Sequence, residues 1–454
     1  MIKTSLLLCA AYLSLAVQAA ASDSPCTGFQ FTNDTAAQSE EFWVNASDET
    51  IKACIAQYGV DALSEDGSQP LNLAAYYRKT STIVEHLIQS GADVEHRSEL
   101  GQTPLLEASF GNGSTRSIAA LLEAGADVNA QTPDGWTPLL FAARDNPKPA
   151  DIRLLVDAGA DIEAMAEDQF SGTPIMWSIL NSNAAITKAL IDAGANPDRL
   201  TPEESTAFIL ALNVKEYQRA LLLIDAGVDP LNGMSPDDAF SYVSQFVSAY
   251  DRPPLKLIKA MLDTGAIQKP EHKGELIFSV LKDSYPNLDR QLFELIMERK
   301  LTIADPKGNS LLVEAIDVEL SAQDIIRLAS QGADVNRHSA PKNDSLGKPE
   351  WETPLTRAAG LQDEDYALSV VRTLISASAQ INRTNSSGDT PLHEAVFRGN
   401  AKIAKYLIQS NAQLNLRNAA DDTAYTQYIR YMTFSKKPIP PHMKSVLKKL
   451  EAYR

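Results

Sequence analysis

Short apolar patterns at helical spacing recur along the chain and predict pairs of short helices. In the most regular stretch, apolar residues stand at Ile118, Leu121 and Leu122, and 34 residues later at Ile152 and Leu155. Apolar residues three and four positions apart indicate one buried face of an amphipathic helix. Because helices of this length are marginal when isolated, we expect them to stack on neighbouring units.

The ends of these predicted helices are marked by words that repeat at the same interval. Thr103-Pro104-Leu105 recurs as Thr137-Pro138-Leu139, and Gly125-Ala126-Asp127 recurs as Gly159-Ala160-Asp161. Threonine is a good helix N-cap, and proline suits the first helical position, where no N–H is needed. Glycine ends a helix because it adopts the left-handed conformation without strain. Each unit is therefore predicted to be helix, turn, helix and an extended segment.

The repeated unit resembles the ankyrin repeat, which has about 33 residues and a T-P-L-H-x-A motif. Its closest copy here is Thr390-Pro391-Leu392-His393-Glu394-Ala395. The resemblance implies an all-α ankyrin-repeat solenoid of helix-turn-helix units with short β-hairpin fingers. We expect about eleven units, including degenerate ones at both ends.

The repeat pattern varies along the chain, and its variation predicts the domain organisation. Residues 231–304 have lost much of the pattern, but two atypical repeats fit there without a domain break. The insertion at residues 338–350 is polar and contains two prolines, so we expect an exposed loop. The predicted parts are a signal peptide (1–21), an N-terminal leader and capping unit (22–62), regular repeats (63–230), degenerate repeats (231–304), repeats with the insertion (305–415) and a C-terminal capping repeat (416–454).

The first 21 residues have the features of a secretory signal peptide. Lys3 precedes an apolar run, and Ala19-Ala20-Ala21 offers small residues for cleavage. The alternative is an N-terminal membrane anchor, but the run is short for a bilayer span. We expect a periplasmic or secreted protein with no membrane span.

The chain carries a formal net charge of −17. This charge argues against nucleic acid and against anionic lipid surfaces as partners. It favours solubility and is compatible with a basic partner. Lys444, Lys448 and Lys449 near the C-terminus form a solvated helix face or, alternatively, a docking tail.

Cysteine usage fits an exported protein. The chain has three cysteines, and Cys9 leaves with the predicted signal peptide. Cys26 and Cys54 are then the only possible intramolecular pair in an oxidising compartment. Such a disulfide would hold the leader onto the first repeat, whereas two free buried thiols are the alternative.

The sequence offers no pattern typical of an active site, a metal site or a cofactor site. His393 belongs to the repeat motif, in which the family uses the ring to tie the turn to the helix. Gly111-Asn112-Gly113 stands where a turn between helices is expected. An enzyme with its site in the degenerate repeats is the competing possibility, but only His272 and ordinary carboxylates are available there. We predict no enzymatic activity, no cofactor and no metal.

The ankyrin resemblance implies a binding face along the first helices of the repeats. In the family, the position two residues after the leucine of the motif faces this surface. In this chain the position is occupied, unit by unit, by Leu73, Glu107, Phe141, Trp177, Leu210, Glu314, Arg357 and Glu394. Large apolar residues on a surface mark interaction sites. We therefore predict a protein-binding set of Phe141, Trp177, Leu73 and Leu210, with Trp136 at a fingertip.

An alternative for Phe141 and Trp177 is that they pack on each other or under neighbouring fingers. With the binding interpretation, we expect a monomeric, non-enzymatic scaffold that binds another protein. Such a scaffold could restrain or inhibit its partner, and a structural scaffold of the envelope is the alternative.

Overall fold

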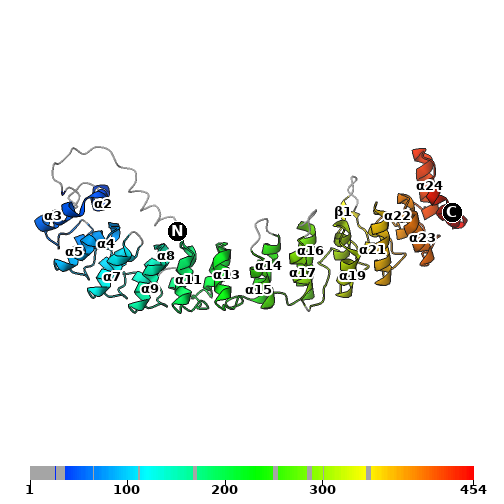
Figure 1. Cartoon of the computed structure of the whole chain (residues 1–454). Helices are drawn as coiled ribbons and strands as arrows, with labels where there is room; N and C mark the ends of the chain where they lie inside the picture. The colour runs from blue at the N-terminus through cyan, green and yellow to red at the C-terminus, as the bar shows by residue number, and fades with distance from the viewer. Residues whose placement is uncertain are drawn as a thin grey trace. The chain divides into compact units, whose positions relative to one another are not determined.

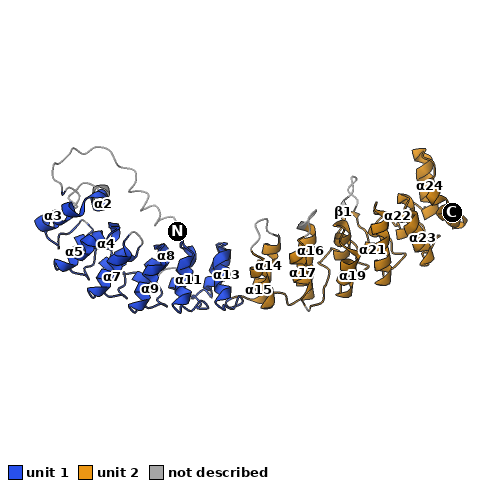
Figure 2. Cartoon of the chain, viewed as in Figure 1, with its two compact units in different colours: residues 1–233 blue, residues 234–454 orange. Residues whose placement is uncertain are grey.

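The chain folds into stacked helix pairs that form two compact units. The computed structural model describes residue 26 and residues 36–64, 66–110, 113–166, 171–248, 254–283, 289–299, 301–343 and 349–453. Unit 1 comprises residues 1–233 and unit 2 comprises residues 234–454 (Figure 2). The division falls near the start of residues 231–304, the stretch predicted to hold degenerate repeats.

Unit 1 is built from successive helix pairs (Figure 1). The first helices of neighbouring pairs pack on one another, as do the second helices, which gives a first-helix row and a second-helix row. The elements are α2 (Ala36–Asn45), α3 (Asp48–Tyr58), α4 (Pro70–Tyr77), α5 (Thr82–Gln89), α6 (Pro104–Ser109), α7 (Thr115–Glu123), α8 (Pro138–Asp145), α9 (Pro149–Asp157), α10 (Pro174–Trp177), the 3₁₀ helix η1 (Ser178–Leu180), α11 (Ala185–Asp192), α12 (Ala207–Asn213) and α13 (Tyr217–Asp225).

Unit 2 repeats this arrangement and contains the strands β1 and β2. Over the described residues, the two units hold twelve helix pairs, one more than the number expected. The elements of unit 2 are α14 (Pro236–Ser248), α15 (Leu255–Asp263), α16 (Pro270–Asp283), α17 (Arg290–Met297), α18 (Leu311–Asp317), α19 (Ala322–Ser330), β1 (Lys342–Asn343), β2 (Pro349–Glu350), α20 (Pro354–Ala359), α21 (Glu364–Ser376), α22 (Pro391–Arg398), α23 (Ala401–Gln409), α24 (Ala424–Ser435), α25 (Pro441–Leu450) and the 3₁₀ helix η2 (Glu451–Tyr453).

The predicted threonine-proline words begin the first helices. The Thr103 hydroxyl accepts a hydrogen bond from the Leu106 N–H at 3.4 Å, and the Thr137 hydroxyl accepts one from the Leu140 N–H at 3.3 Å. In each case the following proline occupies the first turn of the helix. These caps satisfy an N–H group that has no partner inside the helix.

The ends of the second helices have the left-handed backbone that the glycines predict. Gly125 and Gly159 have φ of 90° and 93°. In two later repeats the sequence has drifted away from glycine, yet Ser378 and Asn411 keep the same conformation, with φ of 70° and 67°. The backbone turn is therefore retained where the residue that favours it has been lost.

A hydrogen bond between successive repeats recurs in both units. The Asn129 side-chain oxygen accepts from the Asp161 N–H at 2.8 Å, and that of Asn336 accepts from the Gln380 N–H at 2.7 Å. Each acceptor stands four residues after a helix-ending glycine, Gly125 or Gly332, and the donor lies in the next repeat. This bond gives the extended segment a role in joining neighbouring units, as expected for a stacked-repeat protein.

The fingers between repeats are mostly hydrogen-bonded turns. The Thr132 N–H donates to the Trp136 carbonyl at 3.0 Å, which closes one such turn. Within the described residues, strands are confined to the insertion at residues 338–350, where β1 pairs with β2 in antiparallel fashion and Lys342 lies opposite Glu350. The extra residues of the insertion lengthen that finger enough for the strands to pair.

The N-terminal end of unit 1 is closed by a disulfide. Cys26 and Cys54 are joined, with their Cα atoms 5.6 Å apart. Cys54 lies on α3, and the neighbouring α2 contributes the fully buried Trp43. The predicted signal peptide, residues 1–21, lies outside the described residues.

Candidate functional site

The five predicted protein-binding residues all lie on or beside the first-helix row of unit 1. Leu73 on α4 and Phe141 on α8 are 7% exposed, and Trp136, in the finger before α8, is 8% exposed. Trp177 at the end of α10 and Leu210 on α12 are half-buried. The three aromatic residues of this set come together, whereas Leu73 lies on α4, two repeats before α8, and Leu210 on α12, one repeat after α10.

Five aromatic side chains form a continuous row, which we call the aromatic ladder: Tyr76, Phe110, Phe141, Trp136 and Trp177. Ring centroids are 5.8 Å apart for Tyr76 and Phe110, and 5.6 Å for Phe110 and Phe141. The row continues from Phe141 to Trp136 at 5.2 Å and from Trp136 to Trp177 at 4.9 Å. These spacings are typical of favourable aromatic pairs. The ladder therefore runs across four consecutive repeats.

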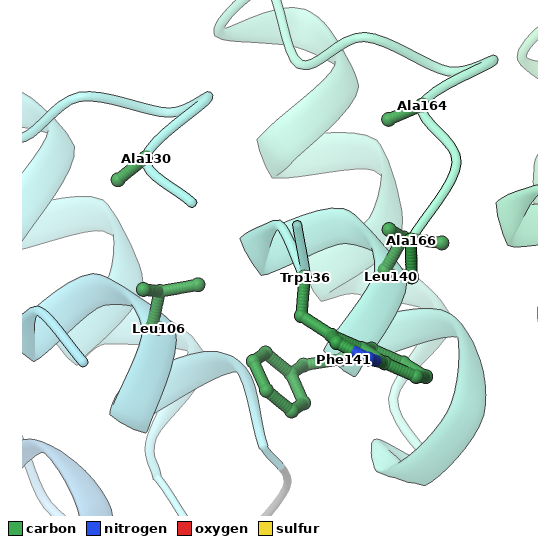
Figure 3. Close-up of a cluster of buried hydrophobic side chains, with 7 residues drawn as sticks. All are labelled: Leu106, Ala130, Trp136, Leu140, Phe141, Ala164 and Ala166. Atoms are coloured by element: carbon green, nitrogen blue, oxygen red, sulfur yellow. The ribbon is translucent and has the colours of Figure 1, made fainter. Parts of the chain in front are cut away.

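The centre of the ladder is anchored in a buried apolar cluster (Figure 3). Figure 3 shows the rings of Trp136 and Phe141 beside each other, with Leu106 on the preceding repeat. Ala130, Ala164 and Ala166 line the cluster from the extended segments, where small side chains leave room for the large rings. Phe110 and Trp177 pack against this cluster and are only half-buried, so the ladder's edges reach solvent.

A guanidinium group lies on the ladder. The Arg144 Cζ atom is 4.2 Å from the centroid of the Trp136 ring and within 6.0 Å of the Phe110, Phe141 and Trp177 centroids. Its Nε also donates to a carboxylate oxygen of Asp145 at 2.6 Å. Aromatic faces attract cations at such distances. Burial raises the pKa of Asp145, although Arg144 opposes that shift.

A carboxyl group occupies the position in the preceding repeat that corresponds to Phe141. This is Glu107 on α6, half-buried and without an ion-pair partner among the described residues. Burial, followed by the negative charge of Asp66, raises the pKa of Glu107 to about 8. Burial also raises the pKa of the nearby Tyr77 above its usual range, and the charges of Glu40, Glu107 and Asp66 add to this shift. This side of the ladder therefore carries a carboxyl group that keeps its proton up to about pH 8 and has no cationic partner among the described residues.

Two of the corresponding residues of unit 2, Arg357 and Glu394, have ionic partners. Arg357 pairs with Asp317, and Glu394 lies 3.8 Å from Arg398 and accepts a hydrogen bond from Asn385. The pKa of Glu394 is still raised to about 7, mainly by burial. Arg357 and Glu394 of unit 2 thus each belong to an ion pair, whereas Phe141 and Trp177 of unit 1 belong to the aromatic ladder.

Sequence reasoning missed Tyr76, Phe110 and Arg144. Each lies three residues after a predicted surface position, namely Leu73, Glu107 and Phe141. Residues three apart share one face of a helix, so a second position per repeat contributes to the same surface. Considering that second position would have found all three.

His393 has the structural role that the motif implies. One ring nitrogen lies 2.8 Å from the Thr390 hydroxyl and the other lies 3.0 Å from the Asp422 carbonyl. Burial lowers its pKa. His272, the histidine considered for an enzyme site, stacks on Phe240 with centroids 3.9 Å apart. Gly111 and Asn112 of the glycine-rich turn lie outside the described residues.

Within the described residues, no group of three or more histidine, cysteine, aspartate or glutamate side chains could hold a metal ion. Among the helices that the structure describes, none combines the length and apolar character needed to cross a membrane.

Comparison with known families agrees with the observed architecture. A family described as ankyrin repeats (3 copies) matches residues 43–132 and 71–166, and one described as ankyrin repeats (many copies) matches residues 355–408. The chain is an ankyrin-repeat protein. No curated protein matches it. Ankyrin repeats are scaffolds for protein–protein interaction, and most of the aromatic ladder lies within the matched repeats of unit 1.

Proposed function

We propose that this ankyrin-repeat protein is exported and binds a partner protein through the aromatic ladder, thereby restraining that partner. The observation that carries the proposal is the ladder itself, a row of aromatic side chains and an arginine across consecutive repeats. Aromatic residues and arginine contribute most of the binding energy at protein interfaces. A buried centre with half-buried edges suits such a surface, because the rings are held in place before the partner arrives.

The residues of the ladder also pack on one another, and this packing is compatible with binding. Rings fixed by neighbours lose little conformational freedom when a partner covers their exposed edges. Tyr76, Phe110 and Trp177 are half-buried, so each has surface left to cover. The chain offers several such edges in one row, as an extended protein surface requires.

Export is supported by two features at the N-terminal end. Lys3 and the following apolar run have the pattern of a signal peptide, and Cys26 is joined to Cys54. The restraining role follows from a binding surface in a scaffold for which we predict no catalytic groups. Fractionation of the producing cells, together with N-terminal sequencing of the mature chain, tests the export.

The binding proposal is tested by affinity capture from the native compartment with the ladder altered at its edges. We expect Tyr76→Ala combined with Trp177→Ala to lose the captured partner, because both substitutions remove exposed ring edges and leave Phe141 and Trp136 in place. Phe434→Ala is the matched control, since Phe434 is 89% exposed on α24 of unit 2. Circular dichroism establishes that each variant is folded.

Equal capture by the parent chain and the ladder variant would refute the ladder as the binding surface. The restraining role is tested separately, by measuring the activity of the captured partner with and without the chain. A partner whose activity is unchanged at saturation would leave a scaffold without an inhibitory role.

A further inference from the structure

The aromatic ladder already shows how this surface holds a cation. Arg144 places its guanidinium over Trp136 while its Nε bonds to the carboxylate of Asp145. The arrangement combines aromatic faces with one carboxylate, and each component attracts a guanidinium. The chain thus contains one guanidinium that is held by aromatic faces and a carboxylate.

The preceding repeat offers the same kinds of components, aromatic faces and a carboxyl group, although its Phe110 ring also lies 6.0 Å from the Arg144 Cζ atom. Phe110 stands at the position that corresponds to Arg144, and Glu107 at the position that corresponds to Phe141. Tyr76 extends the aromatic surface, with its ring centroid 5.8 Å from that of Phe110. We call Tyr76, Phe110 and Glu107 the Glu107 site. Among the described residues, no lysine, arginine or histidine forms an ion pair with Glu107.

The charges around the Glu107 site are negative. Asp66 acts on the carboxyl of Glu107, and the hydrogen bonds that its own carboxylate oxygens accept from the described residues come from Ser64 and Ser68. Tyr77 lies on the same helix as Tyr76, and its pKa is raised by burial and then by the negative charges of Glu40, Glu107 and Asp66. A half-buried carboxyl beside another acid is unfavourable, and a bound cation would relieve it.

The chemistry of the site selects an organic cation. The described residues include no cluster of three or more metal-ligating side chains, whereas ring faces favour guanidinium and ammonium groups. The ladder also continues across the next repeats, so the occupant of the Glu107 site has further aromatic surface to cover. An extended protein segment meets both conditions, and the net charge of −17 complements a basic one.

We propose that the Glu107 site binds an arginine or lysine side chain of a basic, extended segment of the partner protein. This inference rests on the proposed function, because it specifies the partner of the same ladder. The basic side chain lies against Tyr76 and Phe110 and pairs with Glu107. Apolar residues of the segment cover the edges of the neighbouring rings.

The probe is a library of random twelve-residue peptides displayed on phage and selected against the full mature chain. We expect the enriched peptides to share an arginine or lysine next to apolar residues. An enriched peptide is then synthesised in two forms, one with arginine and one with citrulline, which keeps the shape of the side chain and removes its charge. Calorimetry measures the affinity of both forms.

Three variants make the measurement specific. We expect Glu107→Gln to lower the affinity for the arginine peptide by about tenfold or more, because a charge-assisted hydrogen bond is lost. Asp157→Asn, which removes an exposed carboxylate from the second helix α9, is the matched control and changes affinity less than about twofold. Phe110→Leu also lowers the affinity for the peptide, because it removes the ring while keeping an apolar side chain.

Combining the citrulline peptide with Glu107→Gln decides whether the cation of the peptide binds at Glu107. If the peptide's cation sits at Glu107, exchanging arginine for citrulline has little further effect in Glu107→Gln. The affinity of the arginine peptide also rises between pH 7 and pH 9 in the parent chain, with proton release, and this rise is absent in Glu107→Gln.

Enriched peptides without basic residues, or independent effects of citrulline and Glu107→Gln, would overturn the proposal. So would spermidine binding at Glu107 as tightly as the arginine peptide, because the occupant would then be a small amine. Any of these results leaves the proposed function standing as long as Tyr76→Ala with Trp177→Ala still loses the partner. If that double variant retains the partner, the proposed function itself fails.

Discussion

At the scale of single residues, Glu107 couples the stability of unit 1 to pH. Its pKa is about 8 in the folded chain and about 4.5 in the unfolded chain, so the folded form holds more protons between these values. Stability therefore decreases as the pH rises from about 4.5 to 8 and loses no more above that range. The uncompensated carboxyl of a binding site has this consequence for the free chain.

Glu107→Gln tests this coupling because it removes the charge and keeps the shape. We expect the variant to be more stable than the parent chain at pH 8, by roughly 1–2 kcal/mol once solvent screening is allowed for. The gain vanishes near pH 4. Urea unfolding at both pH values measures it, with Asp157→Asn as control. A constant difference across this pH range would contradict the assignment of the shift to Glu107.

Residue-level prediction succeeded where a side chain has a local role. Thr137, Pro138 and Gly159 act within one turn of backbone, and their roles followed from the residues themselves. The ladder could be predicted only in part. Phe141 and Trp177 stand at the surface position of the repeat, whereas Phe110 needs the second position on the same helix face. That Glu107 has no cationic partner among the described residues depends on packing between repeats, which no short sequence pattern records.

At the scale of elements, the ends of the second helices keep a left-handed backbone whether or not the residue there is glycine. Ser378 adopts a φ of 70°, where a side chain is disfavoured, while Gly125 adopts 90° with open space around its Cβ position. The cost of a non-glycine residue in this conformation is about 1 kcal/mol. The repeats of unit 2 tolerate that cost because packing of the neighbouring helices fixes the turn.

Exchanging the residues at these two ends gives opposite expected results. Ser378→Gly stabilises the chain by roughly 0.5–1 kcal/mol, and Gly125→Ser destabilises it by a similar amount. Thermal or urea unfolding of both variants measures the changes. If Ser378→Gly failed to stabilise, the serine would contribute something beyond occupying a left-handed turn.

At the end of α17, a lysine from the preceding helix α16 donates hydrogen bonds to the backbone. The α17 helix ends without a glycine, and the buried Lys273 on α16 donates from Nζ to the carbonyls of Arg299 and Leu301 at 2.7 and 2.9 Å. It also donates to the Gln331 side-chain oxygen at 2.8 Å. Burial lowers the pKa of Lys273 to about 8. A side chain thus satisfies carbonyl groups that follow this helix.

Lys273→Met should therefore destabilise unit 2, because it fills the space but leaves buried carbonyl groups without a donor. The expected loss is roughly 2–4 kcal/mol. Lys269→Met is the control, since Lys269 lies one turn earlier and makes a solvent-exposed ion pair with Asp237. Similar small effects of both substitutions would show that Lys273 does not hold the end of α17.

At the scale of the whole molecule, the stacked repeats distribute stability among neighbours, so an end unit depends on one side only. The N-terminal end has Cys26 joined to Cys54 on α3, while Trp43 of α2 is fully buried. Each repeat of such a stack is stabilised by its own contacts and by its nearest neighbours. A covalent link at the exposed end compensates for the missing neighbour, and it also ties the stability of the chain to an oxidising compartment.

Replacing both cysteines, Cys26→Ser with Cys54→Ser, isolates this contribution without leaving a free thiol. The loss expected from loop closure is about 3–4 kcal/mol for the end that the disulfide holds. Hydrogen exchange followed by mass spectrometry should show faster exchange in α2 and α3, while α20 to α23 of unit 2 keep the exchange rates of the parent chain. Dithiothreitol should reproduce the pattern in the parent chain and change nothing in the variant. Unchanged exchange in α2 and α3 would mean that packing alone closes this end, and the disulfide would then no longer support export.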